Sequence, residues 1–197
     1  MAVESVSTPN GSSGDEQLIS RFMRGDRSVL EELFVRYREI AYRVAYRLLG
    51  NEPDALDAVQ EGFIKALKNL RGFEQRSSFK TWLLRIVSNA SFDLGRQRGR
   101  RGTVSVDSVD WQEQDCSATL GFDPIQEVEQ ADLRQALDAA LQQLPEAQRR
   151  TFVLHVDAGL SYREVAAAMD ISIGTVMSRL FYARQKLKGI LASRMSV

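Results

Sequence analysis

The sequence predicts an all-α protein made of two small helical domains joined by an acidic linker. Apolar residues recur at steps of three and four through almost every patterned segment, which is the spacing of a helix with one buried face. This pattern stops over residues 102–122. Near the C-terminus, two short helical patterns are separated only by the turn "DIS". A brief alternation in "TVSVDSV" is the one hint of a strand.

The expected domain limits follow from where the helical pattern begins and ends. Residues 1–14 are polar and lack the apolar core of a signal peptide, so they are expected to be a disordered leader. Residues 15–101 form the predicted first domain and 123–193 the second. The segment 102–122 has no basic residue and no helical period, and it is the predicted linker.

Four helices are expected in the first domain, and glycine and proline mark their limits. A glycine closes each of the first two helices, at Gly25 and Gly50. Pro53 stands in the first turn of the third helix. The loop "FEQRSS", residues 73–78, precedes a fourth helix that begins at Phe79 and ends in a basic cluster.

Apolar positions on the second and third helices are expected to face a core. Those on the second helix are Leu30, Leu33, Phe34, Tyr37, Ala41, Val44, Ala45 and Leu48. Those on the third are Leu56, Val59, Phe63, Ile64, Ala66 and Leu67.

The second domain begins with the helical pattern "DPIQEVEQADLRQALDAALQQL". The next helix runs from Pro145 to Gly159. Ser161 and Glu164 then have the spacing of a capping box, which starts the short helix "SYREVAAAM". After the turn, Ser172 is a good N-cap for the last helix. Two helices joined by so short a turn must cross steeply, which predicts a helix-turn-helix.

The last helix has a narrow core seam and an unusual outward face. On a helical wheel the seam consists of Val176, Leu180, Ala183 and Leu187. The outward side carries Gly174, Met177, Ser178, Phe181, Tyr182 and Gln185, with Thr175, Arg179 and Arg184 beside it.

This outward face carries no carboxylate, whereas a solvated face usually carries several. A helix in the DNA major groove benefits from a hydroxyl for base edges, apolar groups for thymine methyls and no acid near phosphates. The alternative is a packed helical hairpin whose outer face meets another protein, and the wheel by itself leaves both open.

Charge is distributed unevenly, although 26 basic residues balance 26 acidic ones. Residues 73–102 hold seven basic and two acidic side chains, whereas 103–132 hold eight acidic and no basic ones. Residues 133–197 are basic again. Two polyanion-binding modules around an acidic connector explain this distribution. The alternative is an accident of surface charge.

Several function classes lack the residues they need. Cys116 is the only cysteine, so no internal disulfide forms and a reducing compartment is suitable. His155 is the only histidine, which excludes a multi-histidine metal site. No GxxxxGK phosphate loop is present, and no apolar run is long enough to span a membrane. We therefore expect no enzyme activity, no metal or other cofactor, no small-molecule substrate and no membrane insertion.

Specific motifs carry a resemblance to a known family. "LPEAQRRTFVLHVDAGLSYREVAAAMDISIGTVMSRLFYARQKLK" closely resembles domain 4 of bacterial extracytoplasmic-function sigma factors of the sigma-70 family. "DALDAVQEGFIKAL" resembles region 2.2 of that family, and "FKTWLLRIVSNASFDLGRQRGRR" resembles regions 2.3 and 2.4. Together these segments cover most of residues 15–193 in the order of the family, and they leave the leader and the linker uncovered.

The resemblance implies a protein that binds core RNA polymerase, recognises two promoter elements and helps to open the DNA. The implied partners are core RNA polymerase, promoter DNA and an anti-sigma factor. The implied location is the cytoplasm, either free or held at the membrane through the anti-sigma factor. A DNA-binding regulator that does not engage polymerase is the first rival, and it leaves the region 2 motifs unexplained. An enzyme is the second rival, and no residues support it.

The resemblance also assigns site residues. It places the contacts to the −35 element on His155, Ser172, Gly174, Thr175, Met177, Ser178, Arg179, Phe181 and Tyr182. Contacts to the −10 element are expected from Phe73, Glu74, Arg76, Ser77, Lys80, Arg85, Asn89, Arg96 and Arg100. Core polymerase is expected to contact Asp54, Asp57, Gln60 and Glu61.

Taking a base out of the stack costs free energy, which an aromatic side chain beside the base and polar contacts to its edge offset. Phe73 is expected to supply this aromatic wall.

The predicted −35 residues differ from the family at three positions. Many family members have a basic residue where this chain has Met177, Tyr182 or His155. The resemblance therefore implies which helix reads the DNA, but it does not imply the promoter preference.

Overall fold

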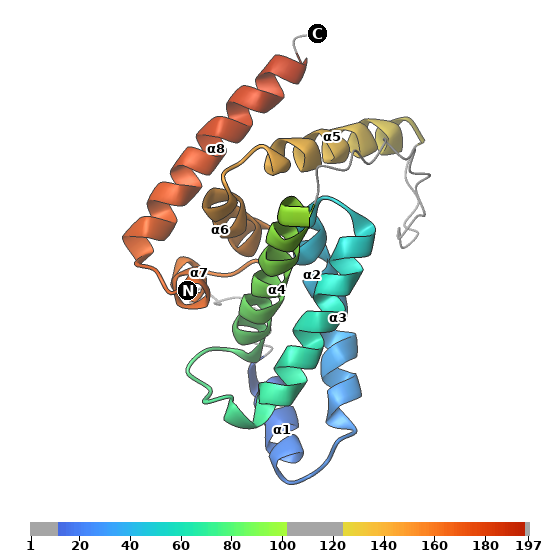
Figure 1. The fold of residues 1–197 in the computed structure, drawn as a ribbon, viewed down its shortest axis with the longest axis vertical. Helices are drawn as coiled ribbons and strands as arrows, with labels where there is room; N and C mark the ends of the chain where they lie inside the picture. Colours follow the sequence, from blue (N-terminus) through green and yellow to red (C-terminus); the bar gives the residue numbers. More distant parts are fainter. Residues whose placement is uncertain (1–11, 102–123, 196–197) are drawn as a thin grey trace, which may run out of the picture.

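The structure is a computed structural model that describes residues 12–101 and 124–195 (Figure 1). The predicted linker, including Cys116, lies outside the described residues, as does the predicted leader up to residue 11. The all-α prediction is confirmed, because every regular element in the described ranges is a helix.

The first half of the chain forms a bundle. Its elements are α1 (Ser12–Met23), α2 (Val29–Leu49), α3 (Glu52–Asn69), the short 3-10 helix η1 (Leu70–Gly72) and α4 (Phe79–Arg101). Helices α2, α3 and α4 run side by side and pack on one another (Figure 1). Helix α1 begins at Ser12, three residues before the predicted start of the domain at residue 15.

The second half adds four helices. They are α5 (Pro124–Gln142), α6 (Glu146–Val156), α7 (Tyr162–Met169) and α8 (Ile173–Met195). In Figure 1, α6 and α7 lie between α4 and α8, and α8 extends away from the bundle. The predicted helix-turn-helix is α7 and α8, separated by residues 170–172.

Glycine ends α2 where the backbone must turn. Gly50 has φ of +76°, and its N–H donates to Tyr46 O at 2.7 Å. A Cβ at this position would lie 3.0 Å from the side chain of Gln142 in α5, so both the conformation and the space favour glycine. Asn51 then caps α3, because its side-chain oxygen accepts from the Asp54 N–H at 3.0 Å.

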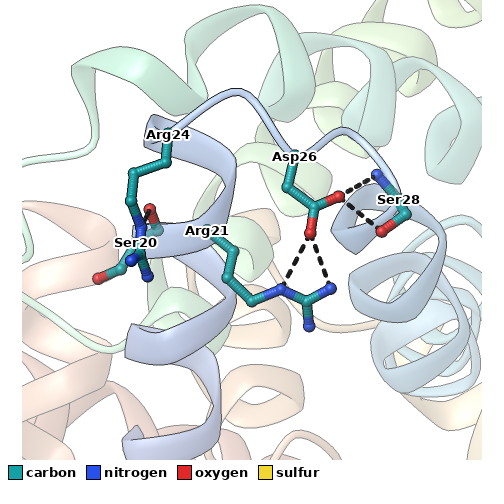
Figure 2. A network of polar contacts seen from close by, with 5 residues as sticks. All are labelled: Ser20, Arg21, Arg24, Asp26 and Ser28. Atoms are coloured by element: carbon teal, nitrogen blue, oxygen red, sulfur yellow. Dashed lines mark hydrogen bonds and ion pairs between the residues drawn. The ribbon is translucent and has the colours of Figure 1, made fainter.

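The turn between α1 and α2 is held by one carboxylate. Asp26 Oδ2 accepts from Arg21 Nε at 3.0 Å and Nη2 at 2.8 Å (Figure 2). Asp26 Oδ1 accepts from Ser28 Oγ at 2.6 Å and Ser28 N at 3.0 Å. These hydrogen bonds, the one from the Ser28 hydroxyl most of all, lower the pKa of Asp26. Arg24 Nε donates to Ser20 O within the last turns of α1.

The core of the bundle lies between α2, α3 and α4. Its buried residues include Leu33, Ala41, Phe63, Leu83 and Val87. On α1, Asp15 is buried and accepts hydrogen bonds from Arg36 and from the Tyr37 hydroxyl. Burial is the main cause that raises the pKa of Tyr37, followed by its bond to Asp15.

The two halves share a hydrophobic core, which the sequence analysis did not predict. From the bundle, α2 and α4 contribute Val44, Leu48, Leu84 and Phe92. From the second half, α6, α7 and α8 and the turn after α6 contribute Val153, Leu154, Ala158, Leu160, Val165, Ala166, Ala168, Val176 and Leu180. The last turns of α2 and the middle of α4 are therefore buried by the helix-turn-helix half.

Candidate nucleic-acid interface

The starts of α7 and α8 are each fixed by a serine cap. Ser161 Oγ accepts from the Glu164 N–H at 3.3 Å, and Glu164 Oε2 accepts from the Ser161 N–H at 2.9 Å, so the predicted capping box is confirmed. Asp170 closes α7 with φ of +54°, in the left-handed region. Ser172 Oγ then accepts from the Thr175 N–H at 3.1 Å, as expected of the cap of α8.

The orientation predicted for α8 is confirmed. Its seam is buried, with Val176, Leu180, Ala183 and Leu187 all at most 5% exposed. Met177, Phe181 and Tyr182 are 54%, 63% and 56% exposed. The Phe181 and Tyr182 rings meet edge to face at a centroid distance of 5.4 Å. Three large apolar side chains in water on one helix face indicate a surface that contacts another molecule.

Three hydroxyls at or beside this face, those of Ser172, Thr175 and Ser178, make hydrogen bonds within the helix itself. Thr175 is half-buried, and its Oγ1 lies 2.9 Å from Ser172 Oγ, so both hydroxyls serve the cap. Ser178 is exposed, and its hydroxyl donates to Thr175 O at 3.0 Å. The Ser178 oxygen still has lone pairs to accept from a base amino group. Gly174 is exposed, and Arg179 is half-buried beside the face.

A shallow pocket lies beside the exposed face and includes a residue that the sequence analysis missed. It is lined by Tyr162, Met177, Phe181, Arg184, Gln185 and Lys188. Tyr162 is the first residue of α7 and contacts the His155 ring edge to face at 4.9 Å. In the sequence, only its position directly after the capping serine could have indicated that Tyr162 belongs to this surface.

His155 is half-buried at the edge of the same surface. Its Nδ1 lies 2.8 Å from Leu160 O. A carbonyl oxygen only accepts, so Nδ1 carries the proton of this hydrogen bond and Nε2 is the ring nitrogen left for an outside partner.

Phe73 corrects one prediction. Its ring is only 7% exposed and packs against Trp82 at 4.9 Å and Phe79 at 6.0 Å between ring centroids. In this structure the ring belongs to the core of the bundle and is not an open aromatic wall. Phe73 follows η1 directly. Burying its aromatic ring against the bundle stabilises the fold more than leaving the ring in water would.

The rest of the loop before α4 is open to solvent at its tip. Glu74 and Arg76 form an exposed ion pair at 2.7 Å. Gln75 between them has φ of +55°. Ser77 is half-buried, and Ser78 caps α4 by accepting from the Thr81 N–H at 3.1 Å.

The predicted −10 residues on α4 are distributed along the whole helix. Arg85, Asn89 and Arg96 are exposed, and Lys80 is half-buried. Arg100 lies on the last turns of α4, where only the backbone is described. Two of these residues are bound by α6: Asn89 accepts from Arg150, and Arg96 pairs with Glu146 at 2.7 Å. The sequence analysis did not single out Arg150.

The residues predicted to contact polymerase on α3 are only partly exposed. Asp57, Gln60 and Glu61 are exposed, and Glu61 pairs with Lys65 at 2.7 Å. Asp54 is 3% exposed; it accepts from Asn51 and pairs with Arg98 of α4. Asp54 therefore holds two helices together and is not available at the surface, which corrects its assignment.

Exposed apolar side chains accompany these carboxylates. Leu56 is 52% and Ile64 44% exposed, and they share a helix side with Gln60. Phe34 on α2 is 41% exposed and meets the Phe63 ring at 4.9 Å. These three residues were expected in the core, and their exposure instead gives α2 and α3 a mixed apolar and acidic outer face.

A basic helical bundle attached to a helix-turn-helix with an acid-free outer face defines a DNA-binding transcription factor. Comparison with known proteins names the family. Residues 33–101 match the model of sigma-70 region 2, and residues 134–187 match that of sigma-70 region 4. The chain belongs to the extracytoplasmic-function (ECF) sigma factors of the sigma-70 family, which are transcription initiation factors.

Two curated relatives illustrate the similarity. The RNA polymerase sigma-H factor of Pseudomonas aeruginosa is 34% identical over 180 residues, which is 88% of this chain and 91% of the relative. The ECF RNA polymerase sigma-E factor of Escherichia coli K12 is 35% identical over 176 residues, 88% of this chain and 92% of the relative.

Two solved structures have the same fold. One is CnrH in complex with the cytosolic domain of CnrY, with a TM-score of 0.67 and 25% identity over 91% of this chain and 97% of that chain. The other is the sigma factor RpoE in complex with the anti-sigma factor NepR from Bartonella quintana, with a TM-score of 0.65 and 27% identity over 82% of this chain and 96% of that chain.

Two features are absent from the described ranges. No helix within 12–101 or 124–195 is long and apolar enough to cross a bilayer. Among the same residues, no group of three or more histidine, cysteine, aspartate or glutamate side chains is arranged to hold a metal ion.

Proposed function

We propose that this ECF sigma factor divides promoter recognition between its two halves: α8 reads the −35 element in the major groove, and the loop at 73–78 together with α4 contacts the −10 element. Its domains are residues 15–101 and 123–193, preceded by a leader at 1–14 and joined by a linker at 102–122. It acts by binding, without catalysing a reaction of its own.

The observation that carries this proposal is the outer face of α8. Met177, Phe181 and Tyr182 are exposed together on a helix whose N-terminus is capped by Ser172. A capped helix N-terminus suits phosphate, and apolar tips suit thymine methyls. His155 Nε2 and the Ser178 hydroxyl supply the polar contacts to base edges beside them.

On the −10 side, polar side chains replace the aromatic wall that Phe73 was expected to form. Glu74, Arg76 and Ser77 lie in the loop, and Asn89 offers an amide for a base edge on α4. Lys80, Arg85, Arg96 and Arg100 supply positive charge for the phosphates. Both Asn89 and Arg96 are exposed, although each also makes one contact with α6.

The polymerase-binding surface is the outer face of α2 and α3. Asp57, Gln60 and Glu61 provide polar contacts, and Leu56 and Ile64 provide exposed apolar area next to them. A small apolar centre surrounded by charged residues is the usual composition of a protein interface. Asp54 contributes indirectly, by fixing α3 to α4.

Control by an anti-sigma factor is also proposed. RpoE of Bartonella quintana was solved with the anti-sigma factor NepR, and CnrH with the cytosolic domain of CnrY. This chain matches both over most of its length. We expect it to work in the cytoplasm, where its polymerase is, and to be retained by such a partner until it is needed.

Reconstituted transcription tests the proposal. The purified chain is mixed with core polymerase and a library of promoter fragments from its own genome, and the start sites are mapped. We expect specific initiation that core polymerase alone does not give. If no fragment initiates above the level of core polymerase, the proposed function is wrong.

A further inference from the structure

A ridge of apolar side chains runs along one side of α8 from its first residue. Ile173, Met177 and Phe181 follow one another at steps of four, which places them on the same side of the helix. All three are exposed. Further along the same side, the ridge continues with Arg184 and Lys188, which are also exposed. This side of α8 is therefore apolar near the N-terminus of the helix and basic beyond it.

Tyr162 of α7 turns part of this ridge into a shallow pocket. The pocket is lined by Tyr162, Met177, Phe181, Arg184, Gln185 and Lys188. The Tyr162 ring contacts the His155 ring edge to face at 4.9 Å between centroids. His155 is itself fixed, because its Nδ1 lies 2.8 Å from Leu160 O. The Tyr162 wall of the pocket is thus supported from α6 and from the turn before α7.

The side chain of Met177 limits what this pocket can recognise in DNA. A thioether is a weak acceptor and has no donor, so Met177 cannot make the paired hydrogen bonds with which arginine recognises guanine. The Phe181 ring offers neither donor nor acceptor. A base is therefore recognised here by burial of an apolar group. In the major groove, the apolar group that an unmodified base pair presents is the C5-methyl of thymine.

The basic residues fit the surroundings of such a methyl group, which lies at the edge of the groove beside the backbone of its own strand. The N-terminal residues of a recognition helix contact base edges, which brings Met177 and Phe181 to the bases. Arg184 and Lys188 lie about two turns further along and reach the phosphates. The sequence of α8 contains no aspartate or glutamate to repel them. This charge complementarity selects DNA, and not another protein, as the occupant of the pocket.

We propose that the pocket of Tyr162, Met177 and Phe181 binds the C5-methyl group of a pyrimidine in the −35 element, so that one promoter position is selected by a methyl group and not by hydrogen bonds. This inference rests on the proposed reading of the −35 element by α8. Met177 and Phe181 contact the methyl group, and Tyr162 shields it from water. Thymine and 5-methylcytosine both carry the required group.

Removal of single methyl groups from the DNA tests the proposal. The probe is a promoter fragment from a start site mapped by reconstituted transcription, in which each thymine of the −35 element, on either strand, is replaced in turn by deoxyuridine. This replacement removes the methyl group and keeps the base pair with its hydrogen-bonding edge. We expect the affinity of the holoenzyme to fall roughly threefold to fivefold at one position, the effect of about one buried apolar carbon. Equal affinity for all the fragments overturns the proposal.

Variants of Met177 connect the methyl group to the pocket. In Met177→Ala the apolar partner is lost, so deoxyuridine at the sensitive position should lower the affinity by at most about twofold. Met177→Leu keeps an apolar side chain of similar size and should restore the full effect. Because Met177 is exposed, both variants are expected to fold. An undiminished effect of deoxyuridine in Met177→Ala would place the methyl group outside the pocket and refute the assignment.

Ser178→Ala is the matched control. Ser178 is the next residue on α8 and is exposed, but it is not among the residues that line the pocket. The ratio of the affinities for thymine and deoxyuridine at the sensitive position should be the same in this variant as in the wild type. If Ser178→Ala lowers the ratio as much as Met177→Ala does, the contact does not depend on the pocket and the proposal is wrong.

A modified cytosine distinguishes the two sources of the methyl group. At the sensitive position, the thymine–adenine pair is replaced by cytosine–guanine or by 5-methylcytosine–guanine. Tighter binding of the methylated pair shows that the pocket accepts the methyl group of either base. Equal binding of the two pairs shows that the pocket requires thymine. Both outcomes support the pocket, because the deoxyuridine result has already assigned the methyl group to it.

The same experiments separate this inference from the proposed function. If the holoenzyme selects a −35 element but no methyl group matters, α8 still reads the element and only the pocket inference is wrong. If, in addition, Met177→Ala binds every fragment as the wild type does, the pocket is a surface for another protein, which also overturns the inference. If no fragment initiates above the level of core polymerase, the proposed function is wrong and the inference falls with it.

Discussion

Gly62 of α3 lies directly against Val87 of α4. A Cβ on Gly62 would be 2.8 Å from Val87 Cγ2 and 3.1 Å from Val87 Cα, and the second of these atoms belongs to the backbone. The absence of a side chain therefore sets how closely the two helices approach. This contact lies at the centre of the bundle that positions both the −10 residues and the polymerase surface.

Gly62→Ala is expected to destabilise the protein by about 1–3 kcal/mol, because the added methyl forces α3 and α4 apart. Chemical denaturation followed by circular dichroism measures the change. Gly189→Ala in α8 is the control, since nothing lies within 4 Å of its Cβ position. There the higher helix propensity of alanine should raise the free energy of unfolding by about 0.5–1 kcal/mol. Equal effects at both positions would contradict the close packing.

Ser178→Ala and Phe181→Ala should each change base preference at one position of the −35 element. Loss of a base contact is expected to cost about 1–3 kcal/mol at that position. Selection from a randomised −35 library, with holoenzyme made from each variant, measures the preference. Arg184→Ala is the comparison and should weaken binding without changing the profile. Unaltered profiles for the first two variants would reassign their side chains to general affinity.

Phe73→Ala is expected to lower the free energy of unfolding by about 3–5 kcal/mol, as for other buried aromatic rings replaced by alanine. The thermal midpoint should fall accordingly. Phe73→Leu keeps most of the buried volume and should recover much of the stability. An unchanged midpoint in Phe73→Ala would place the ring outside the core and restore the aromatic wall that the sequence predicts.

Glu164 should give the protein a pH-dependent stability in the acid range. Burial would raise its pKa, but hydrogen bonds from Ser161 and Thr81, with the charge of Lys80, outweigh this and lower the pKa below 4.5. The folded protein therefore favours the ionised form. The resulting stability is present above the unfolded pKa and is lost as pH falls through the folded value.

Glu164→Gln tests this pH dependence because glutamine keeps the capping-box geometry and removes the charge. We expect the variant to be less stable than wild type at pH 7, and the difference to shrink toward zero as the pH falls below 4.5. Urea unfolding at a series of pH values measures it. A difference that stays constant with pH would show that geometry, and not charge, accounts for the cap.

The sequence predicts local structure well because local signals carry it. The capping box at Ser161, the left-handed glycine at Gly50 and the seam of α8 are all fixed by residues within a few positions of each other. The exposure of Phe181 follows from the same short-range periodicity. These features need no knowledge of which helices meet.

Contacts between distant helices were not predicted, because no local signal in the sequence indicates them. Periodicity predicts that Val44 and Leu48 are buried, but it does not show that residues of α6 and α7 cover them. Arg150 looks like any exposed arginine until α4 is placed beside it. Phe73 lies in a polar stretch, and Asp54 in an acidic one, so their burial depends on Trp82 and Arg98, which come later in the chain.

The core shared by the two halves has a consequence for how the protein can be divided. A fragment that ends at residue 101 would leave Val44, Leu48, Leu84 and Phe92 facing water. Such a fragment is expected to aggregate or to associate with chaperones unless these side chains are made polar. In the intact chain, calorimetry should show a single melting transition, because neither half keeps its full core when the other unfolds.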